Sequence, residues 1–310
     1  MTNAFEQKHY TKVIRYGKSG TQELLNTGDE IVIYEKVDGS NASFAQDTGV
    51  DKVRRFSRKL ELTEEWGLNG FVEWTIDNID GQALLPDVLY FGEWTAPHKV
   101  RYATEFTRTF FLFDLYDTKA KKYLPYETVE TEAKRLGLKL APVLYRGKFI
   151  SFEHLMSFVG KTELGGNVGG NPGGEGIVVK KVNDKDQVFL KLVDEAFLEV
   201  HNSKGSKQKT PKDQNKSSAE REFVVATVTE ARVDKILYKL SDEGKLPDVL
   251  VVQDMGDILK VAGNVVYEDI MEEEAKELLP AEYEKKDIKR AVGGVLPQIV
   301  KQVLRTRGTL

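Results

Sequence analysis

The stretch that determines the fold is Ile31-Val-Ile-Tyr-Glu-Lys-Val-Asp-Gly-Ser-Asn41. Its first four residues form an apolar run typical of a strand, and Asp38-Gly39 is a common turn signal. A lysine two residues before Asp-Gly would hold its amine at the end of the strand, where it can attack a phosphate. The alternative is an ordinary strand-to-turn junction, because Lys-x-Asp-Gly occurs by chance in roughly one chain of this length in 15. The remaining sequence has to distinguish the two.

Composition indicates a globular protein that does not span a membrane. The chain has 310 residues, of which 40% are hydrophobic and 30% charged, and no run approaches the ~20 apolar residues of a membrane helix. There is no cysteine, which excludes disulfides, thiolate metal sites and cysteine nucleophiles. The first ten residues lack the apolar core of a signal peptide, so we expect a cytoplasmic protein. The net charge of −4 means that nucleic-acid binding would have to rest on local basic patches.

Turn signals divide the first 200 residues into short apolar runs, which predict a strand-rich, mixed α/β region. A helix is predicted from Glu127 to Leu138, with Gly137 at its end and Pro142 close behind. The stretch Leu164–Gly176 is rich in glycine but lacks the P-loop pattern, which leaves a flexible lid or a connector. The predicted strands cover residues 31–34, 88–91, 110–115, 177–179 and 188–192.

The character of the sequence changes after residue 200. His201–Lys216 is polar and lysine-rich, which indicates a linker, with an arm that contacts nucleic acid as the alternative. Ser217 and Glu220 then have capping-box spacing, and apolar residues recur at helical spacing in 233–240, 268–279 and 299–304. The sequence therefore predicts a domain over 1–203, a linker over 204–216 and a small all-helical domain over 217–310.

A lysine that carries a nucleotide needs partners of defined chemistry, and the chain offers them in a fixed order. It needs cations for the phosphates, an acid for the ribose hydroxyls, an aromatic face for the base and carboxylates for a metal. Several motifs in order are far more specific than Lys-x-Asp-Gly alone. The stretches that follow Lys36 are Arg54-Arg-Phe-Ser-Arg-Lys59, Tyr90-Phe-Gly-Glu-Trp94, Phe110-Phe-Leu-Phe-Asp114, Gly174-Glu-Gly-Ile-Val-Val-Lys180 and Val188-Phe-Leu-Lys-Leu-Val193.

This series resembles the covalent nucleotidyltransferase superfamily of ATP-dependent polynucleotide ligases and messenger-RNA capping enzymes. It is most similar to RNA ligases of the bacteriophage T4 RNA ligase 2 type, because Asn41 follows the lysine by five residues. Two positions depart from that type: it carries histidine in place of Asp38, and often a lysine in place of Phe189. The resemblance implies an α+β fold, with an antiparallel-sheet, ATP-grasp-like nucleotidyltransferase domain followed by the helical domain.

The resemblance also implies a role for each matching residue. Glu35, Asp38, Arg55 and Lys180 would belong to the nucleotide-binding set, with Arg55 competing with Arg58 for a phosphate and Lys180 or Lys181 replacing the lysine absent at Phe189. The other implied roles are adenylated nucleophile for Lys36, phosphate contact for Lys191 and Arg58, ribose contact for Glu93, adenine stacking for Phe113, metal binding for Glu175 and steadying of the metal's water shell for Asn41.

The implied function is ATP-dependent RNA ligation, with ATP as co-substrate and Mg²⁺ or Mn²⁺ as the metal. The partners would be RNA ends or a nicked RNA duplex, and we expect a monomer that acts in RNA repair without a membrane or protein partner. The alternatives are an ATP-dependent DNA ligase, a capping guanylyltransferase, or a relative that binds nucleic acid without catalysis. Small ligases of this kind are often encoded by phages, so the source stays open.

Overall fold

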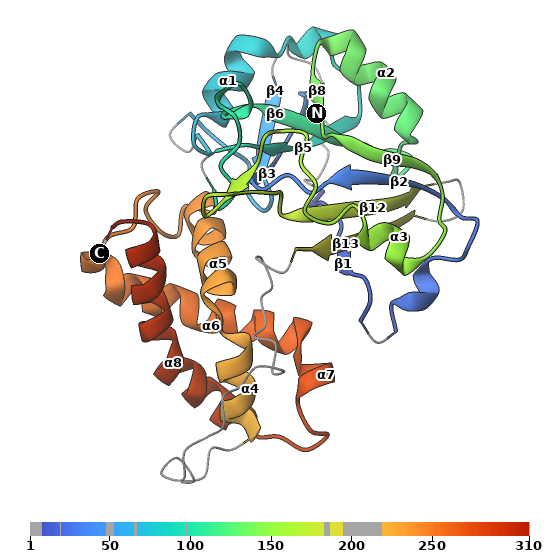
Figure 1. Cartoon of the computed structure of the whole chain (residues 1–310). Coiled ribbons are helices and arrows are strands. Elements are labelled where there is room, and N and C mark those ends of the chain that lie inside the picture. Colours follow the sequence, from blue (N-terminus) through green and yellow to red (C-terminus); the bar gives the residue numbers. More distant parts are fainter. Residues whose placement is uncertain are drawn as a thin grey trace. The chain divides into compact units, whose positions relative to one another are not determined.

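The structure is a computed structural model that describes residues 8–18, 20–47, 53–64, 67–96, 98–182, 187–194 and 219–309. The chain divides into two compact units, Met1–Ala196 and Phe197–Leu310 (Figure 1). The predicted linker over 204–216 and the capping residue Ser217 lie outside the described residues. The predicted boundaries at 203 and 217 therefore stay predictions.

Two β-sheets form the first unit, and most neighbouring strands are antiparallel. Only β1 with β13 and β6 with β8 pair in parallel among the described strands. The first sheet has five strands in the order β1 (Ile14–Arg15), β13 (Gln187–Val193), β12 (Gly176–Val182), β2 (Glu30–Glu35) and β9 (Val143–Lys148). The second has six strands, with β4 (Val53–Ser57), β3 (Ser40–Gln46), β5 (Val88–Trp94), β6 (Phe110–Asp117) and β7 (Lys122–Tyr123) in order and β8 (Lys139–Leu140) beside β6.

Shorter elements complete the first unit. The glycine-rich stretch forms a small hairpin of β10 (Asn167–Val168) and β11 (Asn171–Pro172), and its end leads into β12. It is thus a connector with structure of its own. The helices are η1 (Gln22–Leu24), α1 (Phe71–Asn78), η2 (Gly81–Ala83), η3 (Thr104–Phe106), α2 (Tyr126–Leu136) and α3 (Phe152–Met156).

Apolar side chains on both faces of each sheet explain why these strands appear as nearly continuous apolar runs. The outer face of the first sheet packs around Leu155 of α3, and the outer face of the second sheet packs against α1 and α2 (Figure 1). The inner faces meet in clusters that join Phe91 to Phe189 and Tyr34 to Phe111. All five predicted strands are confirmed, and α2 ends at Gly137, whose φ of +68° is the left-handed cap that glycine favours.

Helices alone form the described part of the second unit, as predicted. They are α4 (Ala219–Thr227), α5 (Glu230–Asp242), η6 (Val252–Asp254), α6 (Met255–Glu273), α7 (Ala275–Leu278) and α8 (Lys285–Thr306), around one apolar core. The helix predicted over 268–279 is interrupted at Glu274, because this carboxylate turns inward to Arg232, 2.7 Å away. Arg232 is only 1% exposed, so its charge must be paired. No helix in the described ranges is both long and apolar enough to cross a membrane.

Candidate active site

The turn between β2 and β3 carries Lys36 to the edge of the space between the two sheets. The backbone amide of Lys36 donates to the carbonyl of Gly176, and its Nζ donates to Glu175 Oε2 at 2.6 Å. Glu175 is 5% exposed and lies 139 residues away in the sequence. The fold therefore brings the predicted nucleophile and the predicted metal-binding carboxylate into direct contact.

Gly39 allows this turn to lie close to β5. A Cβ atom at this position would stand 2.4 Å from the carbonyl oxygen of Trp94 and 3.1 Å from Cγ of Glu93. Any larger residue would push the turn away from β5, so the requirement for glycine here is the close approach of two backbones.

Asn41 and Glu93 are directly opposite each other on β3 and β5. Their strand positions alternate with Phe44 and Tyr90, which pack on the outer face, so both side chains belong to the inner face. Asn41 Oδ1 is buried and has no hydrogen-bond partner among the described residues. An unpaired buried acceptor is costly, and this one lies beside the carboxyl of Glu93, so the pair marks a place for a ligand.

Glu93 is held mostly in its protonated form at neutral pH. Burial raises its pKa from an ordinary 4.5 to about 8, against the opposing charge of Lys36 and with the repulsion of Glu175. His98 and Asp38 also act on it. The charges of Lys36 and Glu175 both act on Glu93, so these two residues belong to its surroundings.

Replacing Glu93 by glutamine is expected to change how stability depends on pH. The folded wild type keeps this proton up to about pH 8, whereas the unfolded chain loses it near pH 4.5. The proton on Glu93 therefore contributes its full amount to the free energy of unfolding below pH 4.5, and this contribution is lost as the pH rises through 8. Glu93→Gln cannot ionise, so its free energy of unfolding relative to wild type should rise by about 4 kcal/mol between pH 5 and pH 9. Urea denaturation at both pH values measures this, with Glu105→Gln as the control. Parallel pH profiles for Glu93→Gln and wild type would contradict it.

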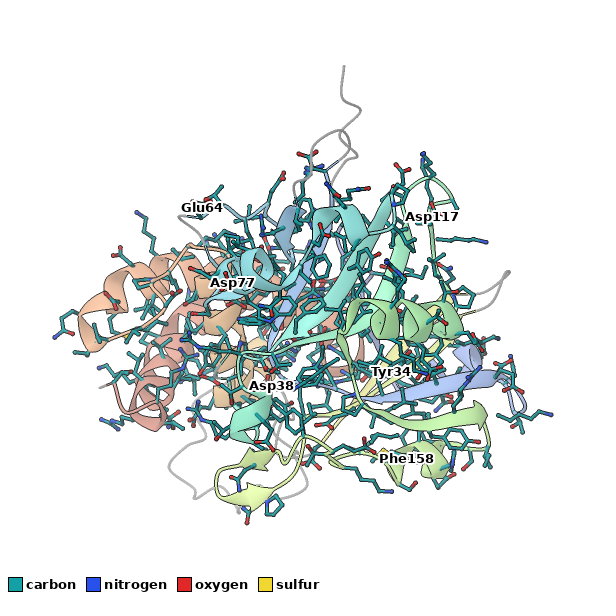
Figure 2. The ribbon with its side chains drawn as sticks, turned by 90° about the horizontal axis from the view of Figure 1, so that it is seen from above. Tyr34, Asp38, Glu64, Asp77, Asp117 and Phe158 are labelled. Atoms are coloured by element: carbon teal, nitrogen blue, oxygen red, sulfur yellow. The ribbon has the colours of Figure 1, made fainter. Side chains whose placement is uncertain are left out.

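Asp38 and Ser40, on either side of Gly39, are both tied to the segment 98–102. Asp38 Oδ2 accepts from the amide of Val100 at 2.7 Å, and the amide of Asp38 donates to the hydroxyl of Tyr102 at 2.7 Å. His98 Nδ1 lies 3.6 Å from Asp38 Oδ1 and its Nε2 lies 3.2 Å from Ser40 Oγ. Burial raises the pKa of Asp38, but the hydrogen bond and charge of His98 and the amide of Val100 outweigh it and leave the pKa below its ordinary value. Figure 2 shows Asp38 beyond the end of the strand that carries Tyr34.

A β-bulge directs Phe113 into the inter-sheet space. Phe91 pairs with Asp114 but Gly92 pairs with Leu112, so Phe113 is the extra residue between them. A bulge re-aims a side chain, and Phe113 packs in both inner clusters, with its ring centroid 5.0 Å from that of Tyr10. The predicted adenine-stacking residue thus lies between the sheets.

Comparison with protein families matches residues 29–193, just over half of the chain, to the family described as RNA ligase. The chain belongs to the RNA ligase family. No curated protein matches its sequence. The similar solved structures include three of the Naegleria gruberi RNA ligase. The variant with ATP and Mn has 20% sequence identity and a TM-score of 0.42, and the match covers 60% of this chain and 56% of that one. The variant with AMP and Mn has 20% identity, a TM-score of 0.43 and coverage of 60% and 56%, and the structure with PPi has 21% identity, a TM-score of 0.42 and coverage of 63% and 58%. The chain thus spans less than two thirds of the length of that ligase, and with TM-scores below 0.5 the family assignment rests on the sequence match alone.

The side chain of Lys180 contacts the bulge of β6 in this member of the RNA ligase family, and its role as a replacement for a phosphate-binding lysine stays a prediction. It is 4% exposed, and its Nζ donates to Asp114 Oδ2 at 2.7 Å and to the carbonyl of Phe113 at 2.8 Å. The hydroxyl of Tyr10 donates to the same carboxylate oxygen. Lys180 therefore joins β12 to the bulge of β6 and positions Phe113. Lys181 is tied to Asp29 at 3.0 Å instead.

Replacing Lys180 by methionine should consequently reduce stability. Breaking a buried ion pair leaves an unpaired carboxylate, and the expected loss is about 3 kcal/mol in the free energy of unfolding. Urea denaturation at pH 7 measures this, and Lys180→Met with Asp114→Asn should recover part of the loss because no charge is then stranded. If Lys180 contacted phosphate instead, Lys180→Met would weaken ATP binding at unchanged stability.

The two competing arginines have different surroundings. Arg55 pairs with Phe44, an outer-face residue, and its guanidinium donates to Thr75 of α1 and to the carbonyl of Val53. Its side chain therefore lies on the outer face of the second sheet, whereas Asn41 and Glu93 lie on the inner face. Arg58 is exposed just beyond β4, which leaves it as the arginine available for a phosphate.

The carboxylate of Glu35 is bonded to the segment that leads into the glycine-rich connector. It alternates with Tyr34 and Lys36 along the strand, and both carboxylate oxygens are engaged at 2.8 Å, by Thr162 Oγ1 and by the amide of Glu163. Burial raises its pKa. These bonds tie the strand that precedes Lys36 to the start of the glycine-rich connector, and the predicted contact of Glu35 with the nucleotide stays a prediction.

Lys191 pairs with Val178, which in turn pairs with Tyr34. Tyr34 and Val178 belong to an inner cluster, so Lys191 also lies on the inner face, where its predicted phosphate contact would be. Phe189, two residues earlier, is 4% exposed and packs on Tyr123 at 4.9 Å between ring centroids. That position serves the core, which explains why no lysine stands there.

Three residues that contact the site, His98, Tyr102 and Tyr10, were not among the predicted site residues. His98 follows Glu93 by five residues, and this proximity was a minor indication from the sequence that it faces the site. Tyr10 and Tyr102 belong to no recognisable pattern, and their contacts with Asp114 and Asp38 arise from the fold.

Proposed function

We propose that this chain is an ATP-dependent RNA ligase that joins a 3′-hydroxyl to a 5′-phosphate through an AMP carried on Lys36. One observation supports this above all: Lys36 Nζ contacts Glu175 Oε2 at 2.6 Å, while Asn41 and Glu93 lie opposite each other on the adjoining strands. An amine beside carboxylates and an unpaired amide oxygen is what nucleotidyl transfer to lysine requires. Unit 1 would then be the nucleotidyltransferase domain.

The residues present fit a divalent cation. Carboxylate and amide oxygens are the ligands that Mg²⁺ and Mn²⁺ prefer, and Mg²⁺ commonly uses one or two carboxylates together with water and substrate phosphates. The unpartnered Oδ1 of Asn41 and the buried Glu175 provide such oxygens. No cluster of three or more acidic or histidine side chains suited to a metal exists in the described part of the chain, which agrees with a site completed by substrate. A cation held there would neutralise phosphate charge.

The proposed reaction begins at Lys36 Nζ. Its lone pair has to be free before it can attack, and Glu175 Oε2, which accepts its hydrogen bond, would take the proton that it releases. Nζ then forms a bond to the α-phosphorus of ATP, and the bond from that phosphorus to pyrophosphate breaks. Arg58 and Lys191 would neutralise charge that develops on the phosphate oxygens.

Two transfers would complete the cycle. An oxygen of the RNA 5′-phosphate attacks the phosphorus of the lysine-bound AMP, and the P–N bond breaks to return the amine of Lys36. The 3′-hydroxyl of the second RNA end then attacks the activated 5′-phosphate and releases AMP. Throughout, Glu93 would hold the ribose, and its protonated carboxyl can donate a hydrogen bond to a hydroxyl below about pH 8.

Covalent labelling tests the proposal. The full chain, incubated with α-³²P-ATP and Mg²⁺ or Mn²⁺, should retain label after denaturing electrophoresis, and a nicked RNA duplex with a 5′-phosphate should then remove it while sealing the nick. Labelling by GTP in place of ATP would instead indicate a capping guanylyltransferase. Sealing of DNA but not RNA would indicate a DNA ligase, and RNA binding without any label an inactive relative.

A further inference from the structure

We propose that His98 is a positioning residue for the transfer of AMP to Lys36, acting by holding Asp38 and Ser40 together across Gly39. The inference rests on the proposed function, since it concerns the turn that presents the nucleophile. It concerns a residue outside the motif series, on the segment that follows β5.

Both nitrogens of the imidazole are engaged by the turn. Nδ1 lies 3.6 Å from Asp38 Oδ1, and Nε2 lies 3.2 Å from Ser40 Oγ. The ring is 7% exposed and Ser40 is 2% exposed, so water has little access to replace these contacts. His98 thus joins Asp38, two positions after Lys36, to Ser40, the first residue of β3.

The segment that carries His98 holds the turn at further points. The amide of Val100 donates to Asp38 Oδ2, and the hydroxyl of Tyr102 accepts from the amide of Asp38, each at 2.7 Å. Those two contacts grip Asp38 alone. His98 contacts the residues on both sides of Gly39, where the backbone would meet Trp94 if a Cβ were present.

The position of Lys36 depends on this turn. Its backbone is bonded to Gly176 on the β12 side, and the turn itself is bonded to the segment 98–102 on the β5 side. Loss of the imidazole would release Ser40 and one oxygen of Asp38 while the bond to Gly176 remains. Nζ would then lose its fixed direction relative to Glu93 and Glu175, and a misplacement of about 1 Å can cost about 100-fold in rate.

A positioning role has a kinetic signature that a purely structural role lacks. The predicted contacts of ATP are to Glu93, Phe113, Lys191 and Arg58, whereas the contacts of His98 that hold the turn are to Asp38 and Ser40. We therefore expect the rate of Lys36–AMP formation at saturating ATP to fall while the half-saturating ATP concentration stays within about threefold of wild type.

The test compares three variants in single-turnover labelling with α-³²P-ATP. His98→Leu removes both polar contacts at similar volume and should lower the rate about 10- to 100-fold. His98→Gln keeps one donor and one acceptor, which an amide offers to Asp38 and Ser40, and should retain the rate within about fivefold. His154→Leu makes the same change on α3, where the ring packs on Tyr145 and Phe158, and should leave the rate unchanged.

Thermal denaturation of the same samples identifies loss of folding. If His98→Leu does not fold, Ser40→Ala, which deletes a single hydroxyl, should lower the rate about 3- to 10-fold at unchanged half-saturating ATP. Equal rates for folded His98→Leu and wild type would overturn the inference, as would a His98→Gln variant as slow as His98→Leu. If wild type itself takes no label, the proposed function fails, and this outcome is distinct from both.

Discussion

Replacing Lys36 by alanine is expected to abolish covalent labelling by α-³²P-ATP, with at least a 10³-fold loss. No other group can replace the nucleophile, because a missing amine removes the bond that forms rather than weakening it. Lys191, on the inner face of the first sheet, belongs to another strand, β13, whereas Lys36 Nζ donates directly to Glu175. Labelled protein is measured after denaturing electrophoresis and the modified residue by peptide mapping.

The matched control for this experiment is Lys148→Ala. Lys148 is an exposed lysine at the end of β9, in the same sheet as β2, so its loss removes the same charge without touching the turn. It should label as wild type does. Persistent labelling of Lys36→Ala, or a label mapped to another lysine, would remove the central proposal.

The second large effect is expected for Glu175→Gln, which removes one charge at nearly constant shape. Lys36 loses the carboxylate at 2.6 Å, and the proposed cation loses a charged ligand. We expect the rate of labelling to fall about 100-fold and the half-saturating Mn²⁺ concentration to rise 10- to 100-fold. Labelling across a range of Mn²⁺ concentrations measures both.

The same substitution has an electrostatic consequence that can be checked separately. The charge of Glu175 raises the pKa of Glu93, so its removal should lower that pKa. The pH at which the protein loses the stability contributed by the proton on Glu93 should then move toward neutral pH. Glu105→Gln, an exposed carboxylate of η3, is the control and should change neither property. An unaltered Mn²⁺ requirement in Glu175→Gln would show that this carboxylate does not hold the metal.

Local patterns were sufficient for the strands that carry the motifs. The apolar runs at 31–34, 88–91, 110–115, 177–179 and 188–192 all lie in strands of the structure, because short apolar runs between turn residues have few other ways to be buried. The terminal helices followed from their period for the same reason. The exception at Glu274 arises from a partner, Arg232, that lies 42 residues away.

The roles of single polar residues could not be predicted in this way. Glu35 and Lys180 belong to the motif series, yet one bonds to Thr162 and the other to Asp114. Strand alternation distinguishes Arg55 from Arg58 only after the register of β3 with β4 is known. A bulge then shifts Phe113 and Asp114 relative to that alternation.

The amino-acid sequence by itself determined which strands and helices form, the order of the motifs and the RNA ligase family, because these depend on spacing along the chain. Tertiary structure alone decided which residues surround Lys36. Glu175, which is 139 residues away in the sequence, accepts from Lys36, Glu93 pairs with Asn41 on the neighbouring strand, and His98 contacts Ser40 in the turn. Contacts of this kind depend on sheet register, on a bulge and on the packing of two sheets, and these are set by long-range burial that no local pattern records.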